Sequence, residues 1–324
     1  MIKNTIIPDR IKPGDEIRII APSDSIYRVG GMDANIISQQ KLENWGFKVT
    51  FGEHIFEHDM MNTSAIQSRV SDIHAAFLDK NVKAIITVIG GLTSNEILPY
   101  VNYEIIKANP KIICGFSDFT ALSNAIHAKT GLVTYYGPAF ASLKMLGQLG
   151  DYQDNYFLTA LTNNSFEIVP SKFWSSGPWY DDNGKITLYK NQWSVYNPGD
   201  AEGIVIGGNL DTFTLIQGTP YQPDLSNKIL LVEFSEDNPW EEFSRDLASL
   251  LQAAENPKAL LIGRFPKECK MTHSRLMYVL DKFPILKEIP VIYNLNVGHA
   301  QPIFTIPLGS KIKIDNNLSI KVLY

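Results

Sequence analysis

The sequence has little that would place the protein in a membrane, on nucleic acid or in an oxidising compartment. Only two cysteines occur in 324 residues, Cys114 and Cys269, and they match no metal-binding or redox spacing. Basic and acidic residues number 29 and 34, giving a net charge of -5 without a basic run, so we expect no nucleic-acid partner. No stretch approaches the ~18 apolar residues of a spanning helix, and residues 1–20 lack the apolar core of a signal peptide. These absences predict a cytoplasmic protein with reduced thiols and no membrane partner.

The composition is that of an ordinary globular protein, with 44% hydrophobic and 19% charged residues. At roughly 150 residues per domain, the length predicts two domains. The hydrophobic pattern weakens from about residue 151 to residue 197, where the aromatic segment 173–184 favours an ordered loop over a flexible linker. We therefore expect an N-terminal domain over 1–165 and a C-terminal domain over 166–324.

The first domain alternates strand and helix signals. Apolar runs that predict strands lie at 15–23, 47–51, 82–91, 112–116 and 132–138, and helical spacing appears at 34–46, 63–80, 94–101 and after residue 117. Continuous apolar strands between helices are typical of a parallel sheet covered on both faces. We predict a flavodoxin-like α/β domain, whose ligands would bind beyond the carboxyl ends of the strands.

The second domain has more antiparallel character. Strand signals occur at 202–210, 228–235, 259–265 and 289–295, helical signals at 239–255 and 273–283, and a strand-rich tail at 304–324. The pattern predicts a mixed α/β, strand-rich domain.

Ser117 lies where a short buried strand turns into a helix, in the sequence "IICGFSDFTAL". Such a serine is usually a helix cap, because its oxygen accepts from unpaired N–H groups of the first turn. The same position can carry a nucleophile, since a sharp strand-to-helix turn exposes the hydroxyl above the sheet. The two roles are compatible if Asp118 helps to satisfy the helix start, and this stretch alone leaves the choice open.

Other chemically capable residues also follow apolar strands. Glu233 ends one strand, where a carboxylate is costly unless paired, and it is equally explained as an outward-facing or helix-starting acid. His299 follows another strand in a turn flanked by glycine and proline, although single histidines are usually structural. Gly90 and Gly91 mark a tight turn or a backbone that approaches a reacting group closely. The chain order of serine, acid and histidine is that of one hydrolase class.

A zinc site is a competing interpretation. The segment "HIFEH" places His54 and His58 around Glu57 in the pattern of inverted zinc peptidases. That motif requires a long helix and a third ligand, whereas this stretch follows a strand directly and is cut off by "DMMNTS". We therefore expect a solvated loop and no metal here.

Taken together, these motifs resemble the LD-carboxypeptidase family of serine peptidases, and within it the microcin C immunity peptidases more than the muropeptide-recycling enzymes. The matching stretches run in order along nearly the whole chain, at 12–23, 69–103, 113–122, 197–210, 229–237 and 298–315. A set of this length is more specific than any single motif in it.

The resemblance implies a Ser-Glu-His triad at Ser117, Glu233 and His299. It also implies an oxyanion hole from the backbone N–H groups of Gly91 and Asp118, an active site between the two domains, a homodimer and no cofactor. The expected activity is hydrolysis of a C-terminal amide or peptide bond, as in detoxification of a peptidyl or aminoacyl nucleotide antibiotic. A muropeptide LD-carboxypeptidase of cell-wall recycling is the alternative, and a non-catalytic ligand-binding module is a further one.

Substrate contacts are harder to place. In the microcin branch an aromatic loop stacks on the nucleotide base, and Trp174 or Trp179 would supply it here unless both serve interdomain packing. The resemblance also implies that Asn209 contacts the substrate. One departure counts against a nucleotide: the segment 235–238, "SEDN", is acidic where a basic residue would help to hold a phosphate.

Overall fold

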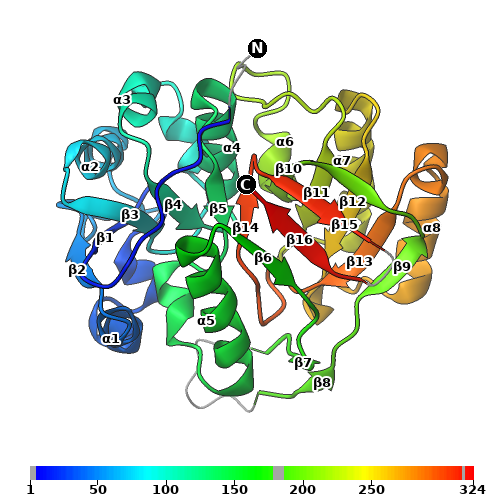
Figure 1. Ribbon diagram of the computed structural model, residues 1–324, viewed down its shortest axis with the longest axis horizontal. Coiled ribbons are helices and arrows are strands. Elements are labelled where there is room, and N and C mark those ends of the chain that lie inside the picture. The colour runs from blue at the N-terminus through cyan, green and yellow to red at the C-terminus, as the bar shows by residue number, and fades with distance from the viewer. Residues whose placement is uncertain (1–4, 178–185, 316–317) are drawn as a thin grey trace.

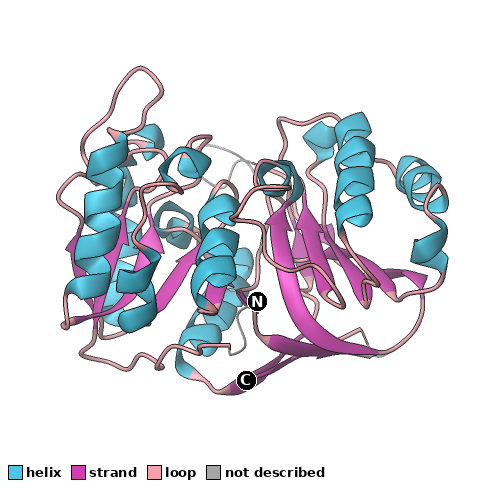
Figure 2. Ribbon diagram, turned by 90° about the horizontal axis from the view of Figure 1, so that it is seen from above, coloured by secondary structure: helices cyan, strands magenta, loops and turns pink. Residues whose placement is uncertain are grey.

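The computed structural model describes residues 5–177, 186–315 and 318–324. It places two sheets side by side, each covered by helices (Figure 1), and the view from above separates the two halves clearly (Figure 2). A third, two-stranded sheet pairs β7 (Phe173–Trp174) with β8 (Tyr189–Lys190).

The first sheet has the strand order β14-β5-β4-β3-β1-β2, and all its neighbours are parallel except the pair of β14 with β5. Its strands are β1 (Glu16–Ile20), β2 (Lys48–Phe51), β3 (Val82–Thr87), β4 (Ile112–Gly115), β5 (Thr134–Tyr136) and β14 (Ile306–Leu308). The helices of this half are α1 (Ile36–Asn44), α2 (Ile66–Leu78), α3 (Tyr103–Ala108), α4 (Phe119–Thr130) and α5 (Gly147–Thr162), with short 3-10 helices η1 (Ile26–Val29), η2 (Asp33–Asn35), η3 (Ser94–Ile97) and η4 (Phe140–Lys144).

Alternation along these strands builds a core on each face of the sheet. Ile85 and Ile113 belong to the cluster formed with α2 and α4, whereas Ile86 and Cys114 belong to the cluster formed with α1 and α5. All four side chains have 0% exposure, as expected for strands that are apolar on both sides. The parallel sheet covered on both faces is therefore confirmed.

The second sheet is strand-rich and mixed, in the order β6-β16-β15-β10-β11-β12-β13-β9. Its strands are β6 (Ser165–Ile168), β9 (Ser194–Asn197), β10 (Ala201–Asn209), β11 (Ile229–Glu233), β12 (Ala259–Gly263), β13 (Val291–Leu295), β15 (Lys311–Ile314) and β16 (Ile320–Leu323). β10 to β13 are parallel, and the outer strands pair antiparallel. The helices here are α6 (Leu210–Thr214), α7 (Trp240–Ala253), α8 (His273–Asp281), η5 (Lys267–Cys269) and η6 (Pro284–Lys287). The expected mixed α/β character is confirmed.

Two segments differ from expectation. Helix α5 begins before and extends into the region where the hydrophobic pattern weakens, and its buried face includes Gly150 and the polar Gln153 beside apolar residues such as Leu149 and Phe157. The strand-rich tail, expected within the second domain, is divided, since β14 joins the first sheet while β15 and β16 join the second.

Strand membership also bears on the domain boundary. The chain enters the second sheet at β6, which starts at Ser165, and returns once to the first sheet at β14. The C-terminal part of the chain thus contributes one strand, β14, to the first sheet. The division into 1–165 and 166–324 remains a prediction about folding units.

Candidate active site

A pocket of about 1010 Å³ is lined by residues of both halves of the molecule. Gly91 and Ser117 line it from the first half, and Asn209 and His299 line it from the second. Its volume is at the upper end of the range for small-molecule sites. The candidate residues predicted from separate strand ends therefore face one cavity.

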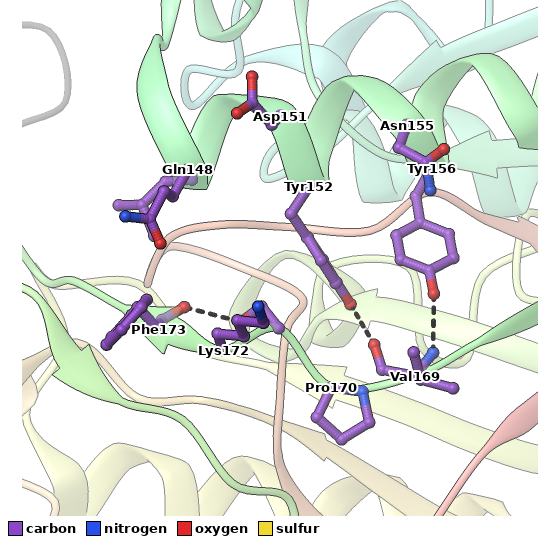
Figure 3. Close-up of a pocket in the computed structure, with 11 residues that line it drawn as sticks. Gln148, Asp151, Tyr152, Asn155, Tyr156, Val169, Pro170, Lys172 and Phe173 are labelled. Atoms are coloured by element: carbon purple, nitrogen blue, oxygen red, sulfur yellow. Dashed lines mark hydrogen bonds between the residues drawn. The ribbon is translucent and has the colours of Figure 1, made fainter.

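A second, smaller pocket of about 360 Å³ lies beside α5 (Figure 3). Tyr152 donates to the carbonyl of Val169 at 2.8 Å, and the N–H of Val169 donates to Tyr156 at 2.9 Å. These tyrosines serve to hold the segment that follows β6. The described lining holds no nucleophile paired with a base, so the larger pocket is the candidate site.

Ser117 occupies a strained turn between β4 and α4. Its φ of 60° lies in the left-handed region that non-glycine residues rarely adopt. Gly90 packs against it closely, because a Cβ added at Gly90 would lie 2.9 Å from Ser117 Cβ and 3.4 Å from the backbone nitrogen of Asp118. The turns after β3 and β4 are therefore in contact at the pocket wall.

Asp118 has a different role from the one expected. It is the N-cap residue of α4, but its φ and ψ of -56° and -24° are helical, whereas a side chain caps from an extended residue, and its carboxylate makes no capping bond. Instead, Oδ2 accepts from Ser23 Oγ at 2.5 Å and from the N–H of Ser94 at 2.8 Å. The prediction that Asp118 satisfies the helix start is wrong, and its carboxylate ties the Ser117 turn to two neighbouring loops.

His299 lies between Ser117 and Glu233. Its Nε2 is 3.0 Å from Ser117 Oγ, and its Nδ1 is 2.8 Å from Glu233 Oε2. Glu233 has 0% exposure at the end of β11, and His299 sits in the loop after β13. Ser117 and His299, 182 positions apart, and His299 and Glu233, 66 positions apart, thus form one hydrogen-bonded series.

The electrostatics of the pair favour a charged couple. Burial opposes a charge on His299, but the nearby Glu233 carboxylate outweighs it and raises the pKa of the imidazole above its usual value. Burial likewise opposes the Glu233 charge, but His299 and further hydrogen bonds outweigh it and lower the pKa of this carboxyl. Each partner stabilises the ionised form of the other, which is the arrangement a histidine base requires.

Tyr136 is a member of the site that the sequence did not reveal. Its hydroxyl donates to Glu233 Oε1 at 2.7 Å and accepts from the N–H of Ser117 at 2.9 Å. The one signal in the sequence is its place at the end of the predicted strand 132–138, at the same edge of the sheet as Ser117.

Of the predicted substrate contacts, Asn209 lines the pocket and Trp174 does not. Asn209 lines the pocket with 3% exposure, and its Oδ1 accepts from the N–H of Thr212 as the cap of α6. Trp174 lies outside the described lining and packs on Arg264, whose guanidinium carbon is 4.6 Å from the ring centroid. Trp179 lies outside the described residues.

The zinc interpretation finds no support in the local structure. His54 lies in a turn, where its Nδ1 is 2.7 Å from Glu57 Oε1, instead of on a long helix. Within the described ranges, no three histidine, cysteine or acidic side chains form a group able to hold a metal.

No described helix has both the length and the apolar character needed to cross a bilayer.

The comparisons with known proteins are decisive for the family. Residues 17–137 match the LD-carboxypeptidase N-terminal domain, and residues 202–314 match the LD-carboxypeptidase C-terminal domain. The chain belongs to the LD-carboxypeptidase family. YocD of Bacillus subtilis, described as a putative carboxypeptidase, is 44% identical over 94% of this chain and 95% of its own length. The microcin C7 self-immunity protein MccF of Escherichia coli is 34% identical over 87% and 86% of the two chains.

Solved structures show the same two-domain fold. An MccF-like protein from Bacillus anthracis matches with a TM-score of 0.95 at 41% identity, covering 98% of this chain and 99% of that one. MccF in complex with aspartyl sulfamoyl adenosine matches with a TM-score of 0.88 at 30% identity and 98% coverage of both chains. Among the relatives found by sequence, a murein tetrapeptide carboxypeptidase of Pseudomonas aeruginosa is 23% identical over 93% of each chain. The chain is therefore a serine carboxypeptidase of a family that includes MccF and murein peptide carboxypeptidases.

Proposed function

We propose that Ser117, His299 and Glu233 are the catalytic triad that cleaves a C-terminal amide or peptide bond. The observation that carries the proposal is the unbroken series of hydrogen bonds from Ser117 Oγ through the His299 ring to Glu233. A nucleophile and a base on the pocket wall, with an orienting acid buried behind them, suit acyl transfer.

Acylation follows from the protonation states of the series. His299 accepts the Ser117 proton through Nε2 as Oγ attacks the scissile carbonyl carbon, and Glu233 holds the Nδ1–H and stabilises the imidazolium. The imidazolium then gives its proton to the leaving nitrogen, which departs as an amine. Water, activated by the same His299, releases the carboxylic acid and restores Ser117.

The oxyanion hole is assigned to the backbone N–H groups of Gly91 and Asp118. Contact between the turns after β3 and β4 supports this assignment, because Gly90 lies against both Ser117 and the nitrogen of Asp118. The N–H of Ser117 is already bonded to Tyr136. One oxyanion donor is typically worth about 2.7 to 4 kcal/mol in the transition state.

We infer that the substrate is a peptidyl or aminoacyl nucleotide of the microcin C type. The MccF structure that holds aspartyl sulfamoyl adenosine supports this choice, because its fold matches over almost the entire chain. Asn209 would contact the acyl part, and Trp174 would contact the base, since the neighbouring Ser175 pairs through its backbone with Gln301 on the pocket lining. The contact from Trp179 and the homodimer remain predictions, the latter testable by light scattering.

The charge of the pocket favours a second candidate, a muropeptide. Asp211, Glu236 and Asp237 line the wall of the second half, while Arg28 and Lys144 lie on the wall of the first. An acidic wall suits a substrate with a free amine and repels a phosphate.

The deciding experiment compares an L,D-linked muropeptide with an aminoacyl sulfamoyl adenosine, using the wild type and Ser117→Ala. We expect hydrolysis of the sulfamoyl adenosine, lowered by a factor on the order of 10⁶ in Ser117→Ala while the variant stays folded. Preferred cleavage of the muropeptide would select the second candidate. Full activity of Ser117→Ala on either substrate would rule out the triad.

A further inference from the structure

The hydrogen bonds around Ser117 form a closed ring of four residues. Ser117 Oγ meets His299 Nε2 at 3.0 Å, and His299 Nδ1 meets Glu233 Oε2 at 2.8 Å. The other carboxylate oxygen, Oε1, accepts from the Tyr136 hydroxyl at 2.7 Å, and that hydroxyl accepts from the N–H of Ser117 at 2.9 Å. The series that starts at the Ser117 side chain therefore returns to the backbone of Ser117.

The direction of each bond in the Tyr136 half of the ring is fixed by chemistry. A backbone N–H can only donate, so the Tyr136 oxygen must accept from Ser117. An ionised carboxylate can only accept, so the single phenolic proton must point to Glu233. Burial, with the Glu233 charge in addition, raises the pKa of Tyr136 well above its usual value, so the hydroxyl keeps this proton.

We propose that Tyr136 is a positioning residue of the triad, which aligns the nucleophile turn with the carboxylate across the two halves of the molecule. The proposal rests on the proposed function and extends it. Ser117 and Tyr136 come from the first sheet, and Glu233 and His299 come from the second, so the ring joins the halves at the reacting atoms.

Two features make this bond consequential. Ser117 is held at a φ of 60°, a conformation that persists only when its surroundings fix it, and the bond from its N–H to Tyr136 is one such restraint. Glu233 is fully buried, so loss of the Tyr136 donor would leave Oε1 without this partner and concentrate the negative charge on the carboxylate.

Close packing keeps water from the Tyr136 and Glu233 side of the ring, whereas Ser117 and His299 face the pocket. A Cβ added at Gly208 would lie 3.0 Å from Tyr136 Cε2, and a Cβ added at Gly298 would lie 2.4 Å from Glu233 Oε2. Glycine at both places lets the backbone approach the ring too closely for water. Hydrogen bonds in such a site are stronger than in water, because the local dielectric is low.

The test is Tyr136→Phe, which removes the hydroxyl and keeps the ring. We expect kcat to fall about 10- to 100-fold, the range for a hydrogen bond to a charged group, with little change in KM. Without the Tyr136 donor, the Glu233 carboxylate carries more negative charge on its oxygens and so raises the pKa of His299. The acid limb of the plot of kcat/KM against pH should therefore move to higher pH by about one unit. Glu236 and Asp237 after β11, and Cys269 in η5, also act on this pair, and they are unchanged in the variant.

Tyr135→Phe is the matched control. Tyr135 neighbours Tyr136 on β5, has 0% exposure and accepts from Arg10 on the other side of the sheet. Loss of the Tyr135 hydroxyl should lower thermal stability and leave the acid limb of the pH profile in place. If Tyr136→Phe behaves in the same way, with an unmoved limb and wild-type kcat, the positioning role is refuted even when Ser117→Ala is inactive. Activity of Ser117→Ala would instead defeat the proposed function itself.

A second variant avoids a folding defect. Difluorotyrosine incorporated at position 136 preserves the shape and strengthens the O–H donor. The carboxylate charge is then better stabilised, so the acid limb should move to lower pH, opposite to Tyr136→Phe. A shift in the same direction as Tyr136→Phe, or no shift in a folded protein, would overturn the inference.

Discussion

The two halves of the molecule contribute different physical properties to one pocket. The first half contributes backbone geometry, since Ser117 and Gly91 have φ values of 60° and 142° in the turns after β4 and β3. The second half contributes buried charge, from Glu233 at the end of β11 and His299 after β13. Changes to the backbone of these two turns should therefore act through shape, and changes to Glu233 and His299 through electrostatics.

The largest effect should come from breaking the link between the halves. His299→Ala removes the base that joins Ser117 to Glu233, and we expect kcat to fall by a factor on the order of 10⁶, as for Ser117→Ala. The double variant should be no slower than either single variant, because the residues act as one unit. Steady-state kinetics with the verified substrate provide the measurement.

His54→Ala serves as the control for this pair and addresses the zinc alternative. His54 lies in the turn that carries "HIFEH", away from the described lining of the pocket. We expect normal activity from this variant, and no loss of wild-type activity in the presence of a chelator. A chelator-sensitive enzyme would contradict the assignment of the base to His299.

The next largest effect should follow from adding a single methyl group to the turn after β3, at Gly91. Gly91→Ala would place a Cβ 2.3 Å from Ser23 Oγ and 2.4 Å from Asp24 Oδ1, so the N–H must move from the position proposed for the oxyanion hole. Loss of one such donor lowers kcat about 10²- to 10³-fold. The acid limb of the pH profile should stay in place, because His299 is untouched.

Gly14→Ala isolates backbone strain from this steric effect. Gly14 also has a positive φ, 94°, and nothing lies within 4 Å of an added Cβ. The variant should lose stability with unchanged kcat. If the two alanine variants lose kcat equally, proximity of Gly91 to the reacting oxygen is not the cause.

The contrast between the halves also explains what the sequence could predict. Continuous apolar runs ended by Ser117, Glu233 and His299 predicted that the three residues lie at strand ends, and geometry brings them together. Strand ends in a parallel sheet meet at one edge, so the local pattern predicted which edge of each sheet carries the site. The meeting of Ser117 from one sheet with Glu233 and His299 from the other was expected only from the family resemblance. Helix α5 was missed because Gly150 and the polar Gln153 stand on its buried face and weaken the apolar signal there.

Contacts between residues distant in the chain could not be read in this way. The bonds of Asp118 to Ser23 and Ser94 depend on loops more than 20 positions away, and no local pattern encodes them. Tyr136 looked like any aromatic strand residue, because its role depends on the buried oxygen of Glu233 in the other half. The contact of Tyr136 with Glu233 forms because the two sheets lie side by side, an arrangement that Figure 2 shows.

A smaller effect should follow from reversing the charge of the second wall. Asp237→Lys replaces an exposed acid on the pocket lining, so substrates with an anionic acyl residue should gain relative to cationic ones. We expect the ratio of kcat/KM for aspartyl against lysyl sulfamoyl adenosine to rise about tenfold, equivalent to about 1.4 kcal/mol. Glu241→Lys makes the same charge change on α7, outside the described lining, and should leave the ratio unaltered. Equal shifts in both variants would mean that only net charge matters.

The smallest effect concerns the carboxyl group of Asp24 in the first half of the molecule. Burial raises the pKa of Asp24 from 3.8 to about 6, aided by Asp118 and opposed by Arg28. Because the folded protein holds this proton more tightly than the unfolded chain, the associated stability is complete below about pH 4 and is lost as pH rises through about 6. Asp24→Asn cannot ionise, so it should raise the free energy of unfolding by about 1 to 3 kcal/mol at pH 7.5 and by much less at pH 4. Denaturant titrations at the two pH values measure this, with exposed Asp33→Asn as the control. An equal gain at both pH values would show that Asp24, like its neighbours in the first half, acts through shape and not through charge.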